Sequence, residues 1–184
     1  MANHDPDIHQ RIIEKCREGD SRSQYRLYKL YSKAMFNIAI RLLANRMDAE
    51  DVLQEAFVSA FRKIGDFRGD SAFGAWLKRI VINHCISFLK SKKQVFEDLS
   101  EQFENITDEN EEDNNCRFEP EFLHETIKSL PDGSRIVFNL FLLEDYKHRE
   151  IAQMLGISES TSKSQYQRAL MLLKEKLVVY EKQI

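Results

Sequence analysis

A stretch near the C-terminus, REIAQMLGISESTSKSQYQRALMLL at 149–173, carries the polar side chains whose types and spacing best suit recognition chemistry. It reads as a helix, a tight turn and a second helix that opens with small polar residues, which are mediocre helix formers. Short polar side chains let a helix enter a nucleic-acid groove, while longer ones reach base edges and phosphates. The pattern favours a helix-turn-helix facing duplex DNA, although a solvated helix face is the competing interpretation. The candidate contact residues are Ser160, Thr161, Lys163, Ser164, Gln165, Gln167 and Arg168.

The two helices must be joined by a turn that fixes their crossing angle. Gly156 suits a turn conformation that other residues resist, and Ser158 is a good cap for the second helix. We expect an inward stripe on the second helix at Tyr166, Ala169, Leu170, Leu173 and Leu177. Ser162 falls where this stripe calls for an apolar residue, so we expect weaker packing at that point.

Enzyme and metal chemistry find little support. Cys16, Cys85 and Cys116 are widely spaced, and no Cys-x-x-Cys or His-x-x-x-His pair is present. His84 and Cys85 are neighbours whose side chains would point about 100° apart on a helix, so they cannot act as a base and its nucleophile. The sequence also lacks a glycine-rich phosphate loop and a catalytic carboxylate pair. We therefore expect no enzyme activity, no metal site and no cofactor.

The charge of the chain is distributed unevenly. The formal net charge of −3 divides into +6 for residues 1–95, −10 for residues 96–121 and +1 for residues 122–184. A segment with so much like charge and few apolar residues is typical of an extended, solvated chain. We interpret it as a linker between two modules.

No apolar run approaches the roughly 18 residues that a membrane span needs. The opening residues, MANHDPDIHQR, also lack the apolar core of a signal peptide. We therefore expect a cytoplasmic protein with reduced thiols and no membrane insertion.

Both modules show helical periodicity and no convincing strand pattern, so we expect an all-α protein. In the first module, apolar steps of three and four predict helices over 24–45, 48–64 and from about 71 to 93. The expected buried stripe of the first of these helices is Leu27, Leu30, Tyr31, Ala34, Ile38 and Leu42. Asp48 is the expected cap of the second of these helices, and Gly65 its left-handed end. In the second module, Pro131 and Gly133 precede an expected helix over 134–144.

Three blocks together resemble a known family. DAEDVLQEAF at 48–57, FRGDSAFGAWLKRIVIN at 67–83 and LPDGSRIVFNLFLLEDYKHREIAQMLGIS at 130–158 are similar to bacterial sigma-70-family sigma factors of the compact extracytoplasmic-function (ECF) group. The resemblance implies an all-α protein of two small helical domains joined by an acidic flexible linker. Region 2, for core polymerase and minus-ten binding, would occupy 1–95, the linker 96–122, and region 4, the helix-turn-helix for minus-thirty-five binding, 123–184.

The resemblance also implies partners and a mechanism. Region 2 would dock on the β′ clamp helices of core RNA polymerase and capture the melted minus-ten element of promoter DNA. Region 4 would dock on the β flap and read the minus-thirty-five element as duplex. The polymerase would perform the chemistry, and an anti-sigma factor is an expected further partner.

Site residues in region 2 follow from the same resemblance. The expected core-polymerase-binding residues are Asp51, Gln54, Glu55 and Phe57, although Phe57 also lies on the expected core stripe. The expected single-strand minus-ten residues are Phe67, Arg68, Asp70, Ser71, Lys78, Arg79 and Asn83. Stacking and cationic surfaces suit single strands, and a flipped base needs a shaped pocket. Trp76 is interpreted as a core residue at this spacing.

The chain departs from the family pattern in both modules. Ser87 stands where an aspartate is frequent, and Lys90, Lys92 and Lys93 stand where arginines are preferred. Lysine neutralises phosphate but loses planar bidentate recognition. In region 4 the run STSKSQ places Ser162 where valine is common and Gln165 where arginine is common, and glutamine suits adenine better than guanine.

One alternative keeps the helix-turn-helix but removes the polymerase. In it the chain is a transcriptional regulator that binds DNA without being a polymerase subunit. The first-module blocks at 48–57 and 67–83 argue against this reading, because a ligand-sensing domain has no reason to carry them.

Overall fold

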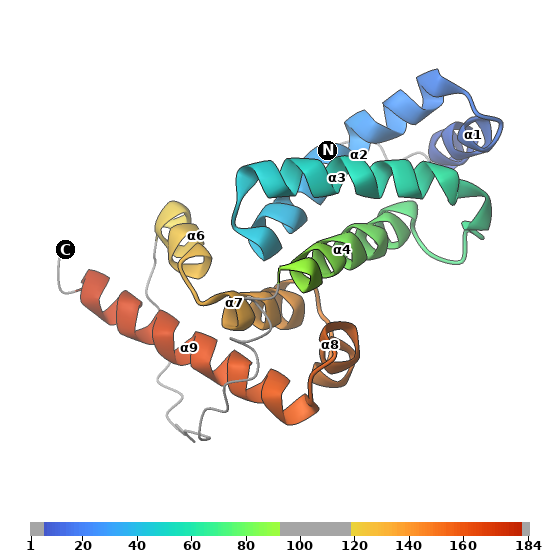
Figure 1. Cartoon of the computed structure of the whole chain (residues 1–184). Helices are drawn as coiled ribbons and strands as arrows, with labels where there is room; N and C mark the ends of the chain where they lie inside the picture. The colour runs from blue at the N-terminus through green and yellow to red at the C-terminus, as the bar shows by residue number, and fades with distance from the viewer. Residues whose placement is uncertain (1–5, 93–118, 182–184) are drawn as a thin grey trace. The chain divides into compact units, whose positions relative to one another are not determined.

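The computed structural model describes residues 6–92 and 119–181, and in these two ranges every regular element is helical (Figure 1). The expected all-α class is therefore confirmed. The chain divides into two compact units, residues 1–88 and 89–184. Most of the expected linker, 96–122, lies outside the described residues, so the domain limits stay predictions. No helix in the described ranges is both long and apolar enough to cross a membrane.

The first unit is built from four α-helices and one short 3-10 helix. These are α1 (Pro6–Arg17), α2 (Ser21–Leu43), α3 (Arg46–Arg62), η1 (Ile64–Asp66) and α4 (Phe73–Ser91). Helix α2 packs against both α1 and α3 (Figure 1). The sequence patterns gave α2, α3 and α4 within a few residues. Helix α1 was not expected, because it lies ahead of the first apolar repeat that was assigned to a helix; Ile13 and Cys16 are buried in it.

The turn between α1 and α2 is held by backbone hydrogen bonds. Gly19 takes a left-handed φ of 84°, its N–H bonds to Cys16 O at 3.1 Å, and Asp20 N–H bonds to Lys15 O at 3.0 Å. This pair of bonds is a Schellman motif, which closes a helix on a left-handed residue. The Asp20 carboxylate then caps α2 by accepting from Ser23 N–H at 2.9 Å, and the hydrogen bonds from Ser23 lower its pKa. The position at which α1 ends is thus fixed by its own chain.

Two expected helix ends in the first unit were wrong. Helix α3 begins at Arg46, and its cap is Asn45, whose side chain accepts from the Asp48 N–H at 3.1 Å. Asp48 therefore lies inside the first turn of α3, where its negative charge interacts favourably with the helix dipole. Gly65 lies within η1 without a left-handed backbone, and α3 ends at Arg62.

Helix α2 contributes one face to the core of the first unit, and this face is rotated relative to the stripe that the sequence predicted. Leu27, Ile38 and Leu42 are buried, as the periodicity predicts. Leu30 is 54% exposed, because the buried face turns toward Met35 and Ala39 and leaves Leu30 at its edge. Apolar spacing identified the helix correctly but misjudged the direction of its buried side.

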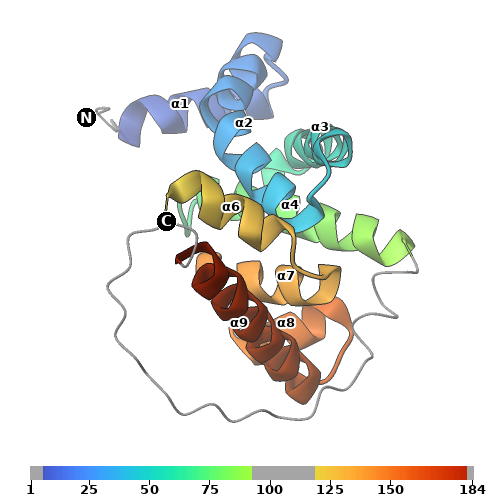
Figure 2. The same cartoon turned by 90° about the vertical axis from the view of Figure 1, so that its left-hand side faces the viewer.

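The second unit contains the expected helix-turn-helix and two preceding helices. Its elements are α6 (Pro120–Lys128), α7 (Asp132–Phe138), the π-helix η2 (Asn139–Leu143), α8 (His148–Leu155) and α9 (Glu159–Glu181). Helices α6, α7 and α8 all pack on the long α9 (Figure 2). The helix expected over 134–144 starts earlier and changes to a π-turn, in which Glu144 N–H bonds to Asn139 O at 3.1 Å.

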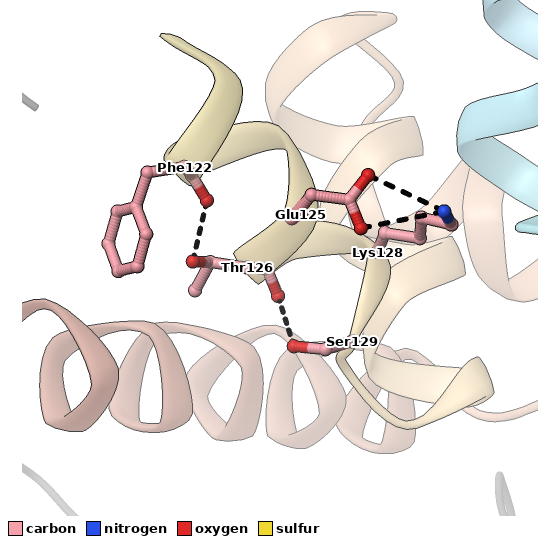
Figure 3. A network of polar contacts seen from close by, with 5 residues as sticks. All are labelled: Phe122, Glu125, Thr126, Lys128 and Ser129. Carbon is pink, nitrogen blue, oxygen red and sulfur yellow. Dashed lines mark hydrogen bonds and ion pairs between the residues drawn. The ribbon is translucent and has the colours of Figure 1, made fainter. Parts of the chain in front are cut away.

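Helix α6 was not expected and begins within the range assigned to the linker. Pro120 occupies its first turn, where the missing N–H costs nothing. Thr126 Oγ1 donates to Phe122 O and Ser129 Oγ donates to Thr126 O, each at 2.7 Å. Figure 3 shows both hydrogen bonds along α6. These side chains bond back to the helix and close its C-terminal end.

The core of the second unit is formed by residues of α7, of α9 and of the segment that follows α6. Leu130, Phe138, Ala169 and Leu173 form one buried cluster. Arg135 is 4% exposed, and its Nη1 donates to Leu130 O at 3.0 Å while Nη2 pairs with Asp132. A buried arginine is costly unless it is paired in this way.

The cap of α3 yields a stability test. Replacing Asn45 with alanine removes the bond to the Asp48 N–H and should lower the free energy of unfolding by about 1 kcal/mol. Asn45→Asp should retain most of the stability, since aspartate caps equally well. Urea unfolding measures both. Equal stability of the alanine and aspartate variants would contradict the assignment of this cap.

Candidate functional site

The turn between α8 and α9 has the geometry that the sequence predicted. Gly156 takes a φ of 74°, and its N–H bonds to Ala152 O at 2.8 Å. Ser158 Oγ accepts from the Thr161 N–H at 2.9 Å, which confirms Ser158 as the cap. The turn therefore fixes the direction in which α9 leaves.

The outer face of α9 is polar over its first three turns. Ser160, Lys163 and Gln167 are exposed, whereas Thr161, Ser164 and Arg168 are half-buried. Lys163 pairs with Glu159 at 2.8 Å, and Ser164 Oγ donates to Ser160 O at 2.9 Å. Six of the seven candidate residues thus reach the outer side of α9 at least in part.

Gln165 is the exception, and its assignment to the DNA-facing side was wrong. Its side chain is 0% exposed, and Oε1 accepts from Ser134 Oγ on α7 at 2.7 Å. Leu170, expected inside, is instead 38% exposed. Both errors have one cause, because the inward stripe of α9 runs through Ser162, Gln165, Ala169 and Leu173. It is rotated toward Gln165 relative to the stripe that the apolar residues suggested.

Ser162 is buried at the position where weak packing was expected. Its Oγ lies 3.0 Å from His148 Nδ1, so a hydrogen bond replaces the missing apolar contact between α8 and α9. The His148 ring stacks on Phe141 with centroids 4.3 Å apart. Burial and nearby Lys163 lower the pKa of His148, although Glu159 partly opposes them. The neutral form is thereby favoured. The small polar residues of α9 thus serve packing as well as the outer surface.

The candidate docking residues of α3 separate into two groups. Asp51, Gln54 and Glu55 are exposed, but Phe57 is 3% exposed and packs edge-on against Tyr28 with centroids 4.9 Å apart. The expectation that Phe57 makes surface contact is therefore corrected, and Phe57 supports the face from beneath.

Gln54 borders a hollow of about 350 Å³ between α2 and α3. The hollow is lined by Tyr28, Ser32, Lys33, Phe36, Arg46, Glu50, Leu53 and Gln54. Sequence reasoning missed the α2 residues, because they stand outside the matching block. Tyr28, Ser32 and Phe36 follow one another at steps of four residues, and this spacing could have placed them on one face of the helix.

The loop at 65–73 combines a buried anchor with an exposed tip. Phe67, expected to receive a base, is 7% exposed and packs at 5.4 Å from both Phe73 and Trp76, so that expectation is corrected. Arg68, Asp70 and Ser71 are exposed around Gly69, whose φ is 81°. The tip is therefore the part of the loop open to a ligand.

Helix α4 carries the remaining minus-ten candidates. Arg79 and Asn83 are exposed and four residues apart, which places them on one side of the helix. Lys78 is half-buried and points about 100° away from Arg79. The structure thus brings Arg79 and Asn83 together on α4 and separates Lys78 from them.

In the described parts of the chain no three histidine, cysteine or acidic side chains gather as metal ligands would. Cys16 and Cys85 are buried free thiols, and burial raises their pKa values to about 11 and about 12. Both are therefore protonated and poor nucleophiles at neutral pH. Cys116 lies outside the described residues.

Comparison with known proteins matches both units to family models. Residues 27–95 match Sigma-70 region 2, and residues 123–173 match Sigma-70, region 4. The RNA polymerase sigma-H factor of Pseudomonas aeruginosa is 33% identical over 171 residues, which cover 87% of this chain and 89% of that protein. The ECF RNA polymerase sigma-E factor of Haemophilus influenzae is 30% identical over 182 residues, covering 91% and 94%.

Two solved structures share the fold. The sigma factor RpoE of Bartonella quintana, in complex with the anti-sigma factor NepR, has a TM-score of 0.53 and 22% identity over 84% of this chain and 96% of that one. CnrH, in complex with the cytosolic domain of CnrY, has a TM-score of 0.50 and 22% identity over 91% and 96%.

The buried bond between Ser134 and Gln165 can be tested by a double-mutant cycle. Ser134→Ala and Gln165→Leu should be coupled by about 1 kcal/mol in the free energy of unfolding, because each single change leaves a buried partner unsatisfied. Gln167→Leu, an exposed site on the same helix, should show no coupling with Ser134→Ala. Chemical denaturation provides the measurement. A Gln165→Leu variant as stable as the parent would return Gln165 to the outer surface.

Proposed function

Because this chain belongs to the ECF group of sigma-70-family RNA polymerase sigma factors, we propose that it binds core RNA polymerase, directs it to specific promoters and helps to melt the minus-ten element. The observation that carries the proposal is the presence, in one chain and in family order, of a region 2 match and a region 4 match. Sigma factors are initiation factors without catalytic activity of their own. The polymerase accordingly supplies the chemistry, and this chain supplies recognition.

We assign polymerase docking in region 2 to the exposed side of α3. Asp51, Gln54 and Glu55 offer carboxylate and amide groups there, and the hollow beside Gln54 can receive a side chain from the partner. The proposed receptor is the β′ clamp helices. Region 4 would dock on the β flap. A sigma factor of the same fold that is bound to an anti-sigma factor supports an anti-sigma partner for this chain as well.

We assign minus-ten recognition to the loop at 65–73, hereafter the minus-ten loop, and to α4. Arg68, Asp70 and Ser71 at the exposed tip would contact a base extruded from the melted strand. Arg79 and Asn83 on α4 would bind the adjoining single strand, and Lys78 would approach its phosphates. Phe67 shapes the site from within, since its ring anchors the loop.

We assign minus-thirty-five recognition to the outer face of α9. Gln167 and Arg168 are long enough to reach base edges, whereas Lys163 suits a phosphate. Ser160, Thr161 and Ser164 keep the surface narrow, so that the helix can enter the major groove. Gln165 is left out of this set because it is buried.

The domain limits proposed for this mechanism are 1–95 for region 2, 96–122 for the acidic linker and 123–184 for region 4. The start of α6 at Pro120 moves the helical part of region 4 slightly into the linker range. The charge of −10 between 96 and 121 opposes the DNA backbone and suits a basic channel of the polymerase. A regulator acting without polymerase would leave the region 2 match unexplained.

The docking face gives the first functional prediction. Gln54→Ala and Asp51→Arg should weaken binding to core polymerase while leaving thermal unfolding unchanged, because both side chains are exposed on α3. Gln10→Ala, an exposed glutamine on α1, is the matched control. Anisotropy of the labelled chain titrated with core polymerase reports the affinity. Parental affinity in both α3 variants would remove this face from the interface.

The face of α9 gives the second. Lys163→Gln should weaken all promoters alike and reduce the salt slope of holoenzyme binding by about 1. Gln167→Ala should cost about 1–3 kcal/mol and relax base preference at one minus-thirty-five position. Binding to a minus-thirty-five library at two salt concentrations separates these effects. Profiles and slopes identical to those of the parent would mean that this face does not touch DNA.

A further inference from the structure

Arg17, the last residue of α1, joins that helix to the base of the minus-ten loop. Its Nε donates to Ile64 O at 3.4 Å, and its Nη2 donates to Phe67 O. Ile64 begins η1, and Phe67 follows its last residue. One guanidinium therefore contacts the main chain at the first residue of η1 and at the residue that follows η1. The exposed tip, residues 68–72, begins directly after this contact.

The chemistry of arginine suits this arrangement. A guanidinium presents several N–H donors in a rigid planar fork, so two acceptors bound to it have a defined separation and direction. Lysine offers a compact charge on a flexible stem and imposes no such geometry. The carbonyl groups of Ile64 and Phe67 belong to buried residues, with side chains 4% and 7% exposed. The contact therefore links α1 to a rigid part of the unit.

Arg17 is itself held at a fixed position. The Schellman motif at Gly19 closes α1 immediately after it, and Ile13 and Cys16 bury the last turns of α1. Asp20 then begins α2 by capping Ser23. Arg17 is exposed, but the helix end that carries it is closed by backbone hydrogen bonds and buried at Ile13 and Cys16.

A second connection links α1 to the far end of the same loop. His9 Nδ1 lies 3.1 Å from the Tyr31 hydroxyl, and the Tyr31 ring packs on Phe73 with centroids 5.3 Å apart. A Cβ at Gly74 would approach Tyr31 Cε1 to 3.1 Å, so glycine permits this close contact. Phe73 also packs against Phe67. Helix α1 therefore braces both ends of the loop while its tip stays exposed.

We propose that Arg17 is a positioning residue for minus-ten recognition, which holds the carbonyl groups of Ile64 and Phe67 so that the exposed loop tip presents its polar side chains in one orientation. This inference rests on the proposed assignment of the loop to minus-ten binding. Arg17 acts through the backbone and needs no contact with DNA. Substitution of Arg17 should reduce the preference for one base at the flipped position and leave the affinity for core polymerase unchanged.

The test uses holoenzyme assembled with the full chain and a library of promoters that carry a constant duplex minus-thirty-five element and a single-stranded minus-ten segment. Arg17→Gln should reduce the preference for the best base at the flipped position about tenfold, because charge-assisted hydrogen bonds to the loop are lost. Arg17→Lys should reduce it as well, since the charge remains but the fork does not. Arg26→Gln, which removes an exposed arginine from α2, should match the parent.

Affinity for core polymerase and thermal unfolding of the free chain accompany each measurement. A purely structural role would lower both and weaken all bases equally, which would overturn the proposal. Another outcome is that Arg17→Gln weakens holoenzyme binding to all promoters equally and reduces its salt slope, while Arg17→Lys does neither. Arg17 would then be a phosphate contact, and the positioning proposal would also be overturned. If both variants unfold, Arg17 is a stability residue and the positioning role is rejected.

The proposed function fails in a different way. If the parent holoenzyme shows no base preference, or Arg68→Ala and Ser71→Ala leave that preference unchanged, the loop does not read the minus-ten element. If those two variants alter the preference while both Arg17 variants keep it, the loop assignment stands and the role of Arg17 alone is refuted.

Discussion

The packing of α9 on α7 and α8 is the constraint on which the second unit depends. Ala169 and Leu173 bury the helix in the same cluster as Leu130 and Phe138. The bond from Ser134 to Gln165 adds a polar link whose cost on rupture is high, because both groups are buried. Once these contacts choose the inner side of α9, its outer side follows, and with it the residues available to DNA. A rotation of the helix by one position would exchange Gln165 for its neighbours and change the recognition surface.

The same principle operates in the first unit through aromatic packing. Phe67 and Phe73 meet edge-on at the two ends of the minus-ten loop, and Trp76 covers both. Rings in this arrangement are large and have few rotamers, so they hold a loop base firmly while the tip remains free. Such a division suits recognition of a flipped base. Under the proposed function, the loop base must have a defined place, while the polar groups of the tip stay exposed to solvent until the base arrives.

Polar residues inside the helix-turn-helix change how the departures from the family pattern are understood. Ser162 and Gln165 differ from the commoner residues, and both lie at the contact of α9 with its neighbours. Their partners, His148 and Ser134, supply hydrogen bonds that an apolar pair would not need. These substitutions are therefore accommodated by polar bonds within the unit. Under the proposed function, promoter preference would then rest on side chains of α9 that reach its outer side at least in part, among them exposed Gln167 and half-buried Arg168.

The amino-acid sequence by itself determined the helical class, the helices α2, α3, α4, α8 and α9 to within a few residues, and the turn at Gly156. These features depend on local spacing and on the conformational freedom of single residues, which are readable along the chain. The family blocks further indicated the two regions that the family models match. Helices α1 and α6 escaped notice because both lie outside the helix-turn-helix and the family blocks, and α6 begins within the acidic segment that was interpreted as a linker.

Only the tertiary structure decided which side of each helix is buried. Apolar periodicity indicates which part of a helix surface is apolar, but not which neighbouring helices cover it. Leu30 and Leu170 were therefore predicted to be buried, whereas both are exposed. Phe57, Phe67 and Gln165 were placed on functional surfaces and are buried. Gln165 shows the reason most clearly. A polar side chain enters a core when a distant residue, here Ser134 across 31 positions, offers a hydrogen bond, and no local pattern announces that partner.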